Sequence, residues 1–293
     1  MDQRSTYPWS AAILRADNES EHVIHCHGSL ISHDIILTAA HCFKDMSLVP
    51  KLFVVLGALE PLKEGTPIAD KYNKRRKIKS IHEVKEVLLH SEYKFERSQA
   101  YYDIAMIRLT QKVKLNRYIY PICLPMKAVA LKDGEETLRS VQLQRVIVTG
   151  YITDNRDSTG QLHFIEPQIQ TQQFCNESFS NSYITHAGDK QAIGEALPNL
   201  FQSNIMCAAV ETGRDASCRG DSGAPLFRYE FFNESLTERR YIQLGVLHGS
   251  VNSCDNRYPG IYSRLEHPSV FKFIKSFGNI DGKVIYTASS VGM

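Results

Sequence analysis

The sequence predicts an all-β fold, either a sandwich or a pair of barrels, that ends in a helix. Short apolar segments rich in β-branched and aromatic residues recur between Gly and Pro residues, as antiparallel strands do. They include residues 52–56, 104–109, 146–149 and 242–247. The best amphipathic helical pattern lies near the end, over residues 269–275. Many short strands and few helices are typical of sandwiches and barrels.

Composition excludes several classes of protein. The 293 residues are 43% hydrophobic and 23% charged, which favours a folded protein of one large all-β unit or two smaller domains. A net charge of +2 gives no reason to propose a nucleic-acid partner. Because no apolar run approaches the roughly 20 residues needed to cross a bilayer, no membrane span is expected.

Cysteines and glycosylation sequons indicate secretion. The seven cysteines are dispersed, without the Cys-x-x-Cys pairs that would suggest zinc. Asn18, Asn176 and Asn233 each begin an Asn-Glu-Ser sequon, which is usable only on the secretory route. We therefore expect a secreted, extracellular glycoprotein. The first residues lack a signal-peptide core, so we expect the N-terminus to be incomplete.

A histidine follows one of the apolar segments, in the sequence LTAAHC of residues 37–42. Three roles are open to His41: a satisfied core residue, a metal ligand, or a general base for a nucleophile from farther along the chain.

A serine and an aspartate are the other candidates for chemistry. Ser222 lies in the sequence GDSG, where Gly220 leaves room for backbone N–H groups to face a carbonyl oxygen, as an oxyanion hole requires. Asp103 precedes an apolar strand, where an unpaired buried carboxylate would be costly and a partner imidazole would remove that cost. Taken singly, each of the two has a plausible structural explanation.

Taken together and in this order, His41, Asp103 and Ser222 closely resemble the catalytic residues of the chymotrypsin-like (trypsin-fold) serine proteases. The resemblance runs from Tyr7 to about Phe271, and its motifs are LTAAHC, DIA at 103–105, GDSG and PGIY at 259–262. It implies two packed six-stranded antiparallel β-barrels with a C-terminal helix.

The resemblance also implies a layout for the chain. Residues 1–293 would form a single peptidase domain, with upstream propeptide or regulatory domains missing. The expected parts are an N-terminal barrel over about 7–126, a C-terminal barrel over 141–267, a terminal helix over 268–279 and a tail over 280–293.

The family's mechanism implies a role for each residue. His41 would take the proton of Ser222, and Asp103 would hold the imidazole in the required tautomer. Backbone N–H groups of Gly220 and Ser222 would form the oxyanion hole. Neither a metal nor an organic cofactor is expected.

Activation in the family depends on the aspartate before the nucleophile, here Asp221. Proteolysis creates an apolar N-terminus whose ammonium group pairs with this carboxylate. Because the residues before Tyr7 offer no such start, we expect a zymogen-like Gly220 loop. Asp221 would then turn toward solvent or another donor.

The cysteine pattern of the family implies three disulfides: Cys26–Cys42, Cys175–Cys207 and Cys218–Cys254. Cys123, in the sequence YPICLP of residues 120–125, is left unpaired. In relatives a cysteine in this motif joins the catalytic chain to an upstream propeptide or light chain. The alternative for Cys123 is a buried free thiol.

Substrate specificity follows from the residue at the base of the primary pocket, which by its spacing from Ser222 is Ala216 rather than the Asp of trypsin-like enzymes. An uncharged residue at the bottom of the pocket does not compensate a buried cation, so we expect an apolar substrate residue before the scissile bond. His248, Gly249 and Ser250 replace the usual Ser-Trp-Gly of one pocket wall. The full expected pocket comprises Ala216, Ser217, His248, Gly249, Ser250 and Gly260.

The sequence thus predicts a secreted serine endopeptidase that resembles the modular serine proteases of arthropods, which cleave other protease zymogens in immune cascades. Its expected partners are protein and peptide substrates, serpin-type inhibitors and an upstream chain joined through Cys123. Two alternatives are a non-catalytic protease homologue that acts as a binding cofactor and a digestive chymotrypsin- or elastase-like enzyme, which would not need Cys123.

Overall fold

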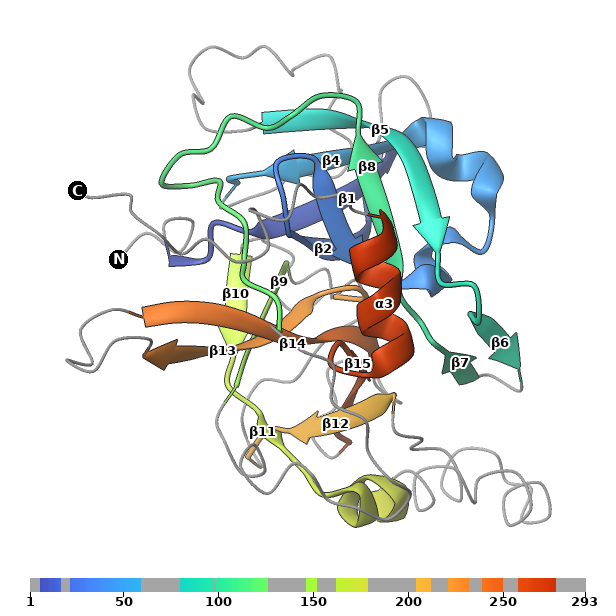
Figure 1. Ribbon diagram of the computed structural model, residues 1–293, viewed down its shortest axis with the longest axis vertical. Coiled ribbons are helices and arrows are strands. Elements are labelled where there is room, and N and C mark those ends of the chain that lie inside the picture. The colour runs from blue at the N-terminus through green and yellow to red at the C-terminus, as the bar shows by residue number, and fades with distance from the viewer. Residues whose placement is uncertain are drawn as a thin grey trace.

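The computed structural model describes residues 6–16, 22–58, 80–96, 99–125, 146–151, 162–178, 204–211, 221–231, 239–249 and 258–277. Two β-sheets pack against each other, and one helix lies beside both of them (Figure 1).

The first sheet is a closed antiparallel barrel with the strand order β1-β2-β3-β8-β5-β4. Its core is apolar because the strands are rich in Ile, Leu and Val, and the side chains of Ile13, Leu37, Val54 and Met106 are fully buried. The strands are β1 (Ser10–Ala16), β2 (His22–Leu30), β3 (Ile35–Thr38), β4 (Leu52–Leu56), β5 (Ser80–Leu89) and β8 (Ala105–Leu109).

Smaller elements surround this barrel. Two short 3-10 helices, η1 (Ala40–Phe43) and η2 (Met46–Lys51), join β3 to β4. A hairpin of β6 (Lys94–Glu96) and β7 (Gln99–Tyr101) precedes β8.

The second sheet has the strand order β10-β9-β13-β14-β15-β12-β11. Its strands are β9 (Ile147–Tyr151), β10 (Leu162–Ile165), β11 (Gln168–Ile169), β12 (Ile205–Ala209), β13 (Pro225–Phe231), β14 (Arg239–Gly249) and β15 (Gly260–Arg264). A short helix over residues 172–178 follows β11.

The two outermost strands of this sheet, β10 and β11, follow each other in the chain and are separated only by Glu166 and Pro167. The sheet therefore curls until its two ends belong to one bent segment, and counting that segment once reduces the seven strands to the six expected. Pro167 causes the interruption since it has no N–H for the ladder, while its carbonyl accepts the Val146 N–H over 3.0 Å. The predicted all-β fold of two barrel-like sheets is confirmed.

Aromatic rings join the two sheets. Trp9, which precedes β1, lies 5.1 Å from Phe227 of β13 and 5.0 Å from Tyr241 of β14, measured between ring centroids. Tyr7 adds a further contact with Phe227 at 5.6 Å. Because these rings exclude water between the barrels, they fix how residues of one barrel face those of the other.

The predicted C-terminal helix is confirmed as α3 (Pro268–Phe277). Proline suits the first position of a helix because the N–H that it lacks would have no partner there. Val270 and Ile274, one turn apart, are buried against the core of the first barrel although α3 follows the last strand of the second (Figure 1). No helix among the described residues is both long enough and apolar enough to cross a membrane.

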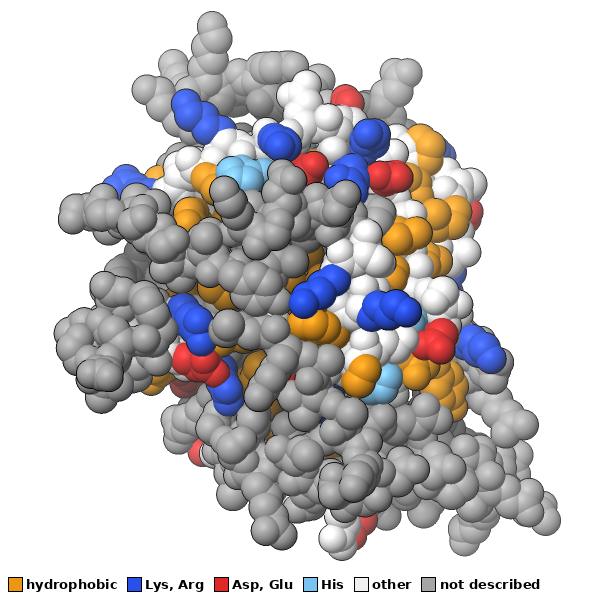
Figure 2. All heavy atoms as spheres, in the orientation of Figure 1, with side chains coloured by type: hydrophobic (Ala, Val, Ile, Leu, Met, Phe, Trp, Pro, Cys, Tyr) orange, Lys and Arg blue, Asp and Glu red, His pale blue; other side chains and the backbone are white. Residues whose placement is uncertain are grey.

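Charged side chains of both signs are interspersed over the upper part of the face shown in Figure 2. Arg108 of β8 pairs with Glu86 of β5 over 2.9 Å and with Asp34 over 3.6 Å. Exposed ion pairs of this kind contribute little to stability, so burial of apolar side chains supplies most of it.

The aromatic contact between the barrels gives a stability prediction. Phe227→Ala should lower the free energy of unfolding by about 3–5 kcal/mol, because it removes a fully buried ring and leaves a cavity. Equilibrium denaturation with the disulfides intact measures this loss. Phe174→Ala is the matched control, since its ring is 40% exposed. Equal losses in the two variants would contradict the role of Phe227.

Candidate active site

His41 lies on η1, which follows β3 directly. The disulfide Cys26–Cys42 ties η1 to β2, so the segment that carries His41 is fixed to the barrel on both sides. A ring nitrogen of His25 also forms a hydrogen bond of 2.6 Å with the Cys42 carbonyl. The side chain of His41 is 20% exposed and therefore within reach of a substrate.

Asp103 lies in the turn between β7 and β8 and is 1% exposed. The preceding residue, Tyr102, has a φ of +48°, a left-handed conformation that costs a bulky residue roughly 1–3 kcal/mol. Its ring stacks on that of His90, 4.9 Å away and inclined by 7°. The Ser263 hydroxyl of β15 donates to the Asp103 carbonyl over 3.1 Å, so both barrels hold this turn.

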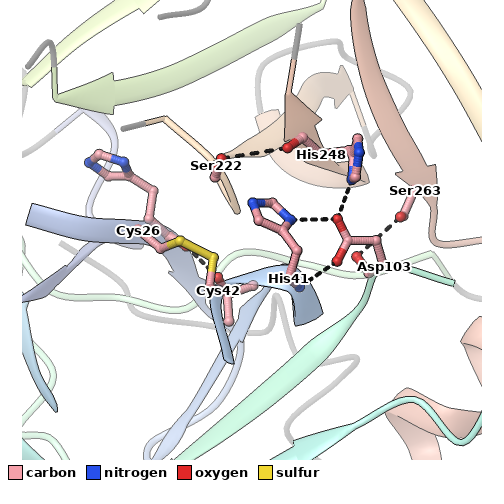
Figure 3. Close-up of polar contacts among 9 residues, drawn as sticks. Cys26, His41, Cys42, Asp103, Ser222, His248 and Ser263 are labelled. Carbon is pink, nitrogen blue, oxygen red and sulfur yellow. Dashed lines mark hydrogen bonds and ion pairs between the residues drawn. A yellow bond between two sulfur atoms is a disulfide. The ribbon is translucent and has the colours of Figure 1, made fainter. Parts of the chain in front are cut away.

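The carboxylate of Asp103 holds His41 by two hydrogen bonds. The backbone N–H of His41 donates to Oδ1 over 2.7 Å, and Nδ1 lies 2.7 Å from Oδ2 (Figure 3). Because an ionised carboxylate can only accept, Nδ1 must carry the proton. The neutral ring then has a free electron pair on Nε2, which is what a general base needs.

A second imidazole shares the same carboxylate. Nδ1 of His248, at the end of β14, also forms a hydrogen bond with Oδ2 of Asp103. The rings of His41 and His248 are nearly perpendicular, with centroids 5.2 Å apart. Sequence reasoning placed His248 in the wall of the specificity pocket, whereas the structure directs its ring to Asp103 (Figure 3). The sequence feature that could have indicated this contact is the titratable His248 at a position where the family usually has Ser.

Ser222 lies in a tight turn just before β13 that packs between the two barrels. Its carbonyl accepts the His27 N–H of β2 over 2.7 Å, and the Gly223 N–H donates to the Leu247 carbonyl of β14 over 2.7 Å. Gly223 has a φ of +88°, and a Cβ there would collide with the His27 carbonyl. The Ser222 hydroxyl lies 3.5 Å from the His248 carbonyl, on the side of the site where the His41 ring lies (Figure 3).

Asp221 is buried beside two further imidazoles rather than turned toward solvent. It is 2% exposed, and its carboxylate oxygens lie 3.9 Å from Nδ1 of His27 and 3.7 Å from Nε2 of His163. The ring of His27 stacks on Tyr151 with centroids 5.0 Å apart. Gly150 leaves the space that the carboxylate fills, since a Cβ there would overlap it. The sequence prediction was that Asp221 turns toward solvent or another donor, and it did not name these two histidines.

The structure also shows the state of the cysteines and the place of two pocket glycines. The structure contains the disulfides Cys26–Cys42 and Cys175–Cys207, and Cys123 is a free, partly buried thiol whose pKa is raised by burial. Gly249 lies at the end of β14 and Gly260 begins β15.

Asn176 lies in the helix over residues 172–178 and is partly buried. Eight further sites lie outside the described residues: Asn18, Ala216, Ser217, Cys218, Gly220, Asn233, Ser250 and Cys254.

The pKa of the Asp103 carboxyl lies below its ordinary value of 3.8. Burial by itself raises this pKa, because desolvation disfavours the charged form. The positive charge and hydrogen bonds of His41 and His248 act in the opposite direction and outweigh burial. Asp103 is therefore ionised throughout the range in which a general base works.

This shift predicts how stability depends on pH. Asp103→Asn should lower the free energy of unfolding at pH 7 by roughly 3 kcal/mol, since hydrogen bonds to charged groups are each worth about 1.5–3 kcal/mol. A carboxyl with a depressed folded pKa contributes stability above pH 3.8 and loses it as the pH falls further, so the difference from the parent should narrow below pH 3.8.

Denaturant titrations at several pH values test this prediction. Asp34→Asn is the control, because Asp34 pairs with Arg108 only near the surface. A difference between Asp103→Asn and the parent that stayed constant from pH 7 to pH 3 would contradict the stabilising role assigned to the ionised carboxylate of Asp103.

Comparisons with known proteins place the chain in a family. The family model described as Trypsin matches residues 1–274. Phenoloxidase-activating factor 1 of Holotrichia diomphalia is 29% identical over 88% of this chain and 64% of its own length. The CLIP domain-containing serine protease B15 of Anopheles gambiae is 26% identical over 90% of this chain and 64% of its own.

Clotting factor C of Tachypleus tridentatus is 28% identical over 87% of this chain and 23% of its own length. The chain thus spans less than two thirds of each of these three relatives. The predicted resemblance to arthropod proteases is confirmed, and the chain belongs to the trypsin family of serine endopeptidases.

Proposed function

We propose that this chain is a serine endopeptidase in which Ser222 is the nucleophile, His41 the general base and Asp103 the residue that orients the base. The observation that carries the proposal is the double hydrogen bond from His41 to the buried carboxylate of Asp103, with distances of 2.7 Å and 2.7 Å. It fixes the tautomer in which Nε2 is basic, and Ser222 lies on that side of the ring.

The chemistry follows from these positions. As the Ser222 oxygen attacks the substrate carbonyl, its proton passes to Nε2 of His41, and the carboxylate of Asp103 stabilises the imidazolium that forms. His41 then returns the proton to the leaving amine, and water repeats the sequence to release the acyl group. Backbone N–H groups of Gly220 and Ser222 would hold the oxyanion, each donor being worth about 2.7–4 kcal/mol.

The relatives support a role in a proteolytic cascade. Their names include a phenoloxidase-activating factor, a CLIP-domain protease and a clotting factor. We propose that this chain acts outside the cell on protein substrates, among them other zymogens, and is controlled by serpin-type inhibitors. Its expected glycosylation and its dispersed cysteines agree with that location.

Cys123 is the proposed attachment point for an upstream chain. It lies on a segment that crosses to β14, where its N–H donates to the Tyr241 carbonyl over 3.1 Å and its carbonyl accepts the Gln243 N–H over 2.9 Å. The backbone that carries this partly buried thiol is thus fixed to β14. The proposed peptidase domain would have its upstream regulatory part joined at this point.

The first test separates catalysis from a binding role. Ser222→Ala and His41→Ala should each lower peptide hydrolysis by roughly 10⁴-fold or more, because both groups act in the chemical step. Circular dichroism should show an unchanged fold. The activated parent, but not Ser222→Ala, should react with a fluorophosphonate probe, and Ser276→Ala serves as the surface control.

Activity of either variant within tenfold of the parent would exclude this triad. A parent that binds substrate proteins but does not react with the probe would instead be a non-catalytic homologue, the alternative role.

A second test concerns specificity. With Ala216 as the proposed base of the pocket, the enzyme should prefer Phe, Tyr, Leu or a smaller apolar residue before the cleaved bond, since an alanine cannot neutralise a buried cation. A fluorogenic peptide library measures this preference. Ala216→Asp should shift it toward Arg and Lys. A parent that already prefers Arg or Lys would contradict the proposed pocket.

A further inference from the structure

We propose that His41, Asp103 and His248 together form a binding site for zinc or a chemically similar divalent transition metal, and that occupation of this site switches catalysis off. The effect on catalysis rests on the proposed function, whereas binding of the metal does not. The three residues offer two imidazole nitrogens and one carboxylate oxygen, all within 4.8 Å of one another.

The ligand atoms converge on one point. Nδ1 of His41 and Nδ1 of His248 both face the same oxygen, Oδ2 of Asp103. Tetrahedral zinc with bonds of about 2.0–2.2 Å keeps neighbouring ligand atoms roughly 3.3 Å apart. The 2.7 Å separation of His41 and Asp103 must therefore widen by about half an ångström to admit the ion, and the shorter contact between His248 and Asp103 must widen further.

The surroundings allow that movement at the histidines and resist it at the aspartate. Each imidazole side chain is 20% exposed, so its ring can withdraw toward solvent, and a water molecule can complete the coordination. Asp103 is 1% exposed and is held by the His41 N–H at Oδ1 and by Ser263 at its carbonyl. The buried carboxylate would anchor the ion while the two rings move outward to make room for it.

The donor set is suited to zinc. Two imidazoles and a carboxylate are the ligands of many three-residue zinc sites that leave one position for water. The other metal-like group among the described residues, Cys26, His41 and Cys42, does not qualify. Its two sulfur atoms form a disulfide and so cannot act as thiolates.

Metal binding would remove the general base by moving a proton within the ring. In the metal-free site Nδ1 of His41 carries the proton, and Nε2 carries the electron pair that accepts the proton of Ser222. Coordination through Nδ1 requires the proton to pass through solvent to Nε2, with no net loss of protons from the neutral ring. Ser222 then faces an N–H instead of a base, so metal binding and catalysis exclude each other.

His248 is what distinguishes this site from a histidine–aspartate pair. A serine at residue 248 can donate a hydrogen bond to a carboxylate but is a poor ligand for zinc. The variant His248→Ser therefore removes the third metal ligand and retains a hydroxyl donor. His33→Ser, in the turn between β2 and β3, is the matched control because it removes a histidine outside the site.

Metal binding is tested first, without reference to activity. The full chain with Ser222→Ala is titrated with Zn²⁺ in a calorimeter and with Co²⁺ in an absorption spectrometer, where tetrahedral cobalt gives intense visible bands. We expect one ion per chain. Since loss of even an outer-shell partner typically costs 10–100-fold in affinity, adding His248→Ser should weaken binding by at least about tenfold, and adding His33→Ser should not. Equal affinity with and without His248 would overturn the site.

Inhibition is tested second, with Ser222 intact. Zn²⁺ should abolish hydrolysis of a peptide substrate by the activated protein, and a chelator should restore it. The concentration for half inhibition should rise at least tenfold in His248→Ser, relative to that variant's own metal-free rate. Zinc bound at the site without loss of hydrolysis would overturn the switch. The activated, metal-free protein could fail to hydrolyse the peptide and yet give the cobalt spectrum once Co²⁺ is added. That result would contradict the proposed function and support the metal site.

Discussion

The buried carboxylate of Asp103 is the constraint on which the site depends. A charge that is 1% exposed must be compensated, and the chain compensates it with N–H groups from η1 and β14. The turn that carries this carboxylate is itself held in place: Tyr102, with its left-handed backbone, stacks its ring on His90, and the Ser263 hydroxyl donates to the backbone carbonyl of Asp103. Satisfying one charge thus organises segments from both barrels.

The barrels must in turn be fixed against each other, because His41 belongs to the first and Ser222 to the second. Aromatic rings around Trp9 supply part of this rigidity. A buried hydrogen bond of 2.6 Å from Ser29 of β2 to Gln243 of β14 supplies another part. Apolar contact and a satisfied polar pair act together here, since the first gives adhesion and the second specifies register.

Two carboxylates in this region are each flanked by two imidazoles: Asp103 by His41 and His248, and Asp221 by His27 and His163. In both cases the aspartate is the residue expected from the family. Beside Asp103, His248 stands where the family usually has a serine. Histidine can donate a proton, accept one or bind a metal, whereas the serine that is usual in the family at residue 248 is a poor metal ligand. The histidines therefore add possible chemistry around these two carboxylates.

The sequence by itself determined the fold class and the identity of the candidate triad. Strand periodicity reports burial of one face, and motifs such as LTAAHC and GDSG are local, so both can be read without knowing the fold. The role of His248 could not be read in this way, because the direction of its ring depends on where β14 places residue 248 relative to residue 103. The order of the seven strands in the second sheet, and the burial of Asp221 beside two histidines, are likewise contacts between segments far apart in the chain. Only the tertiary structure decides such contacts, since they arise when packing brings distant residues to one place.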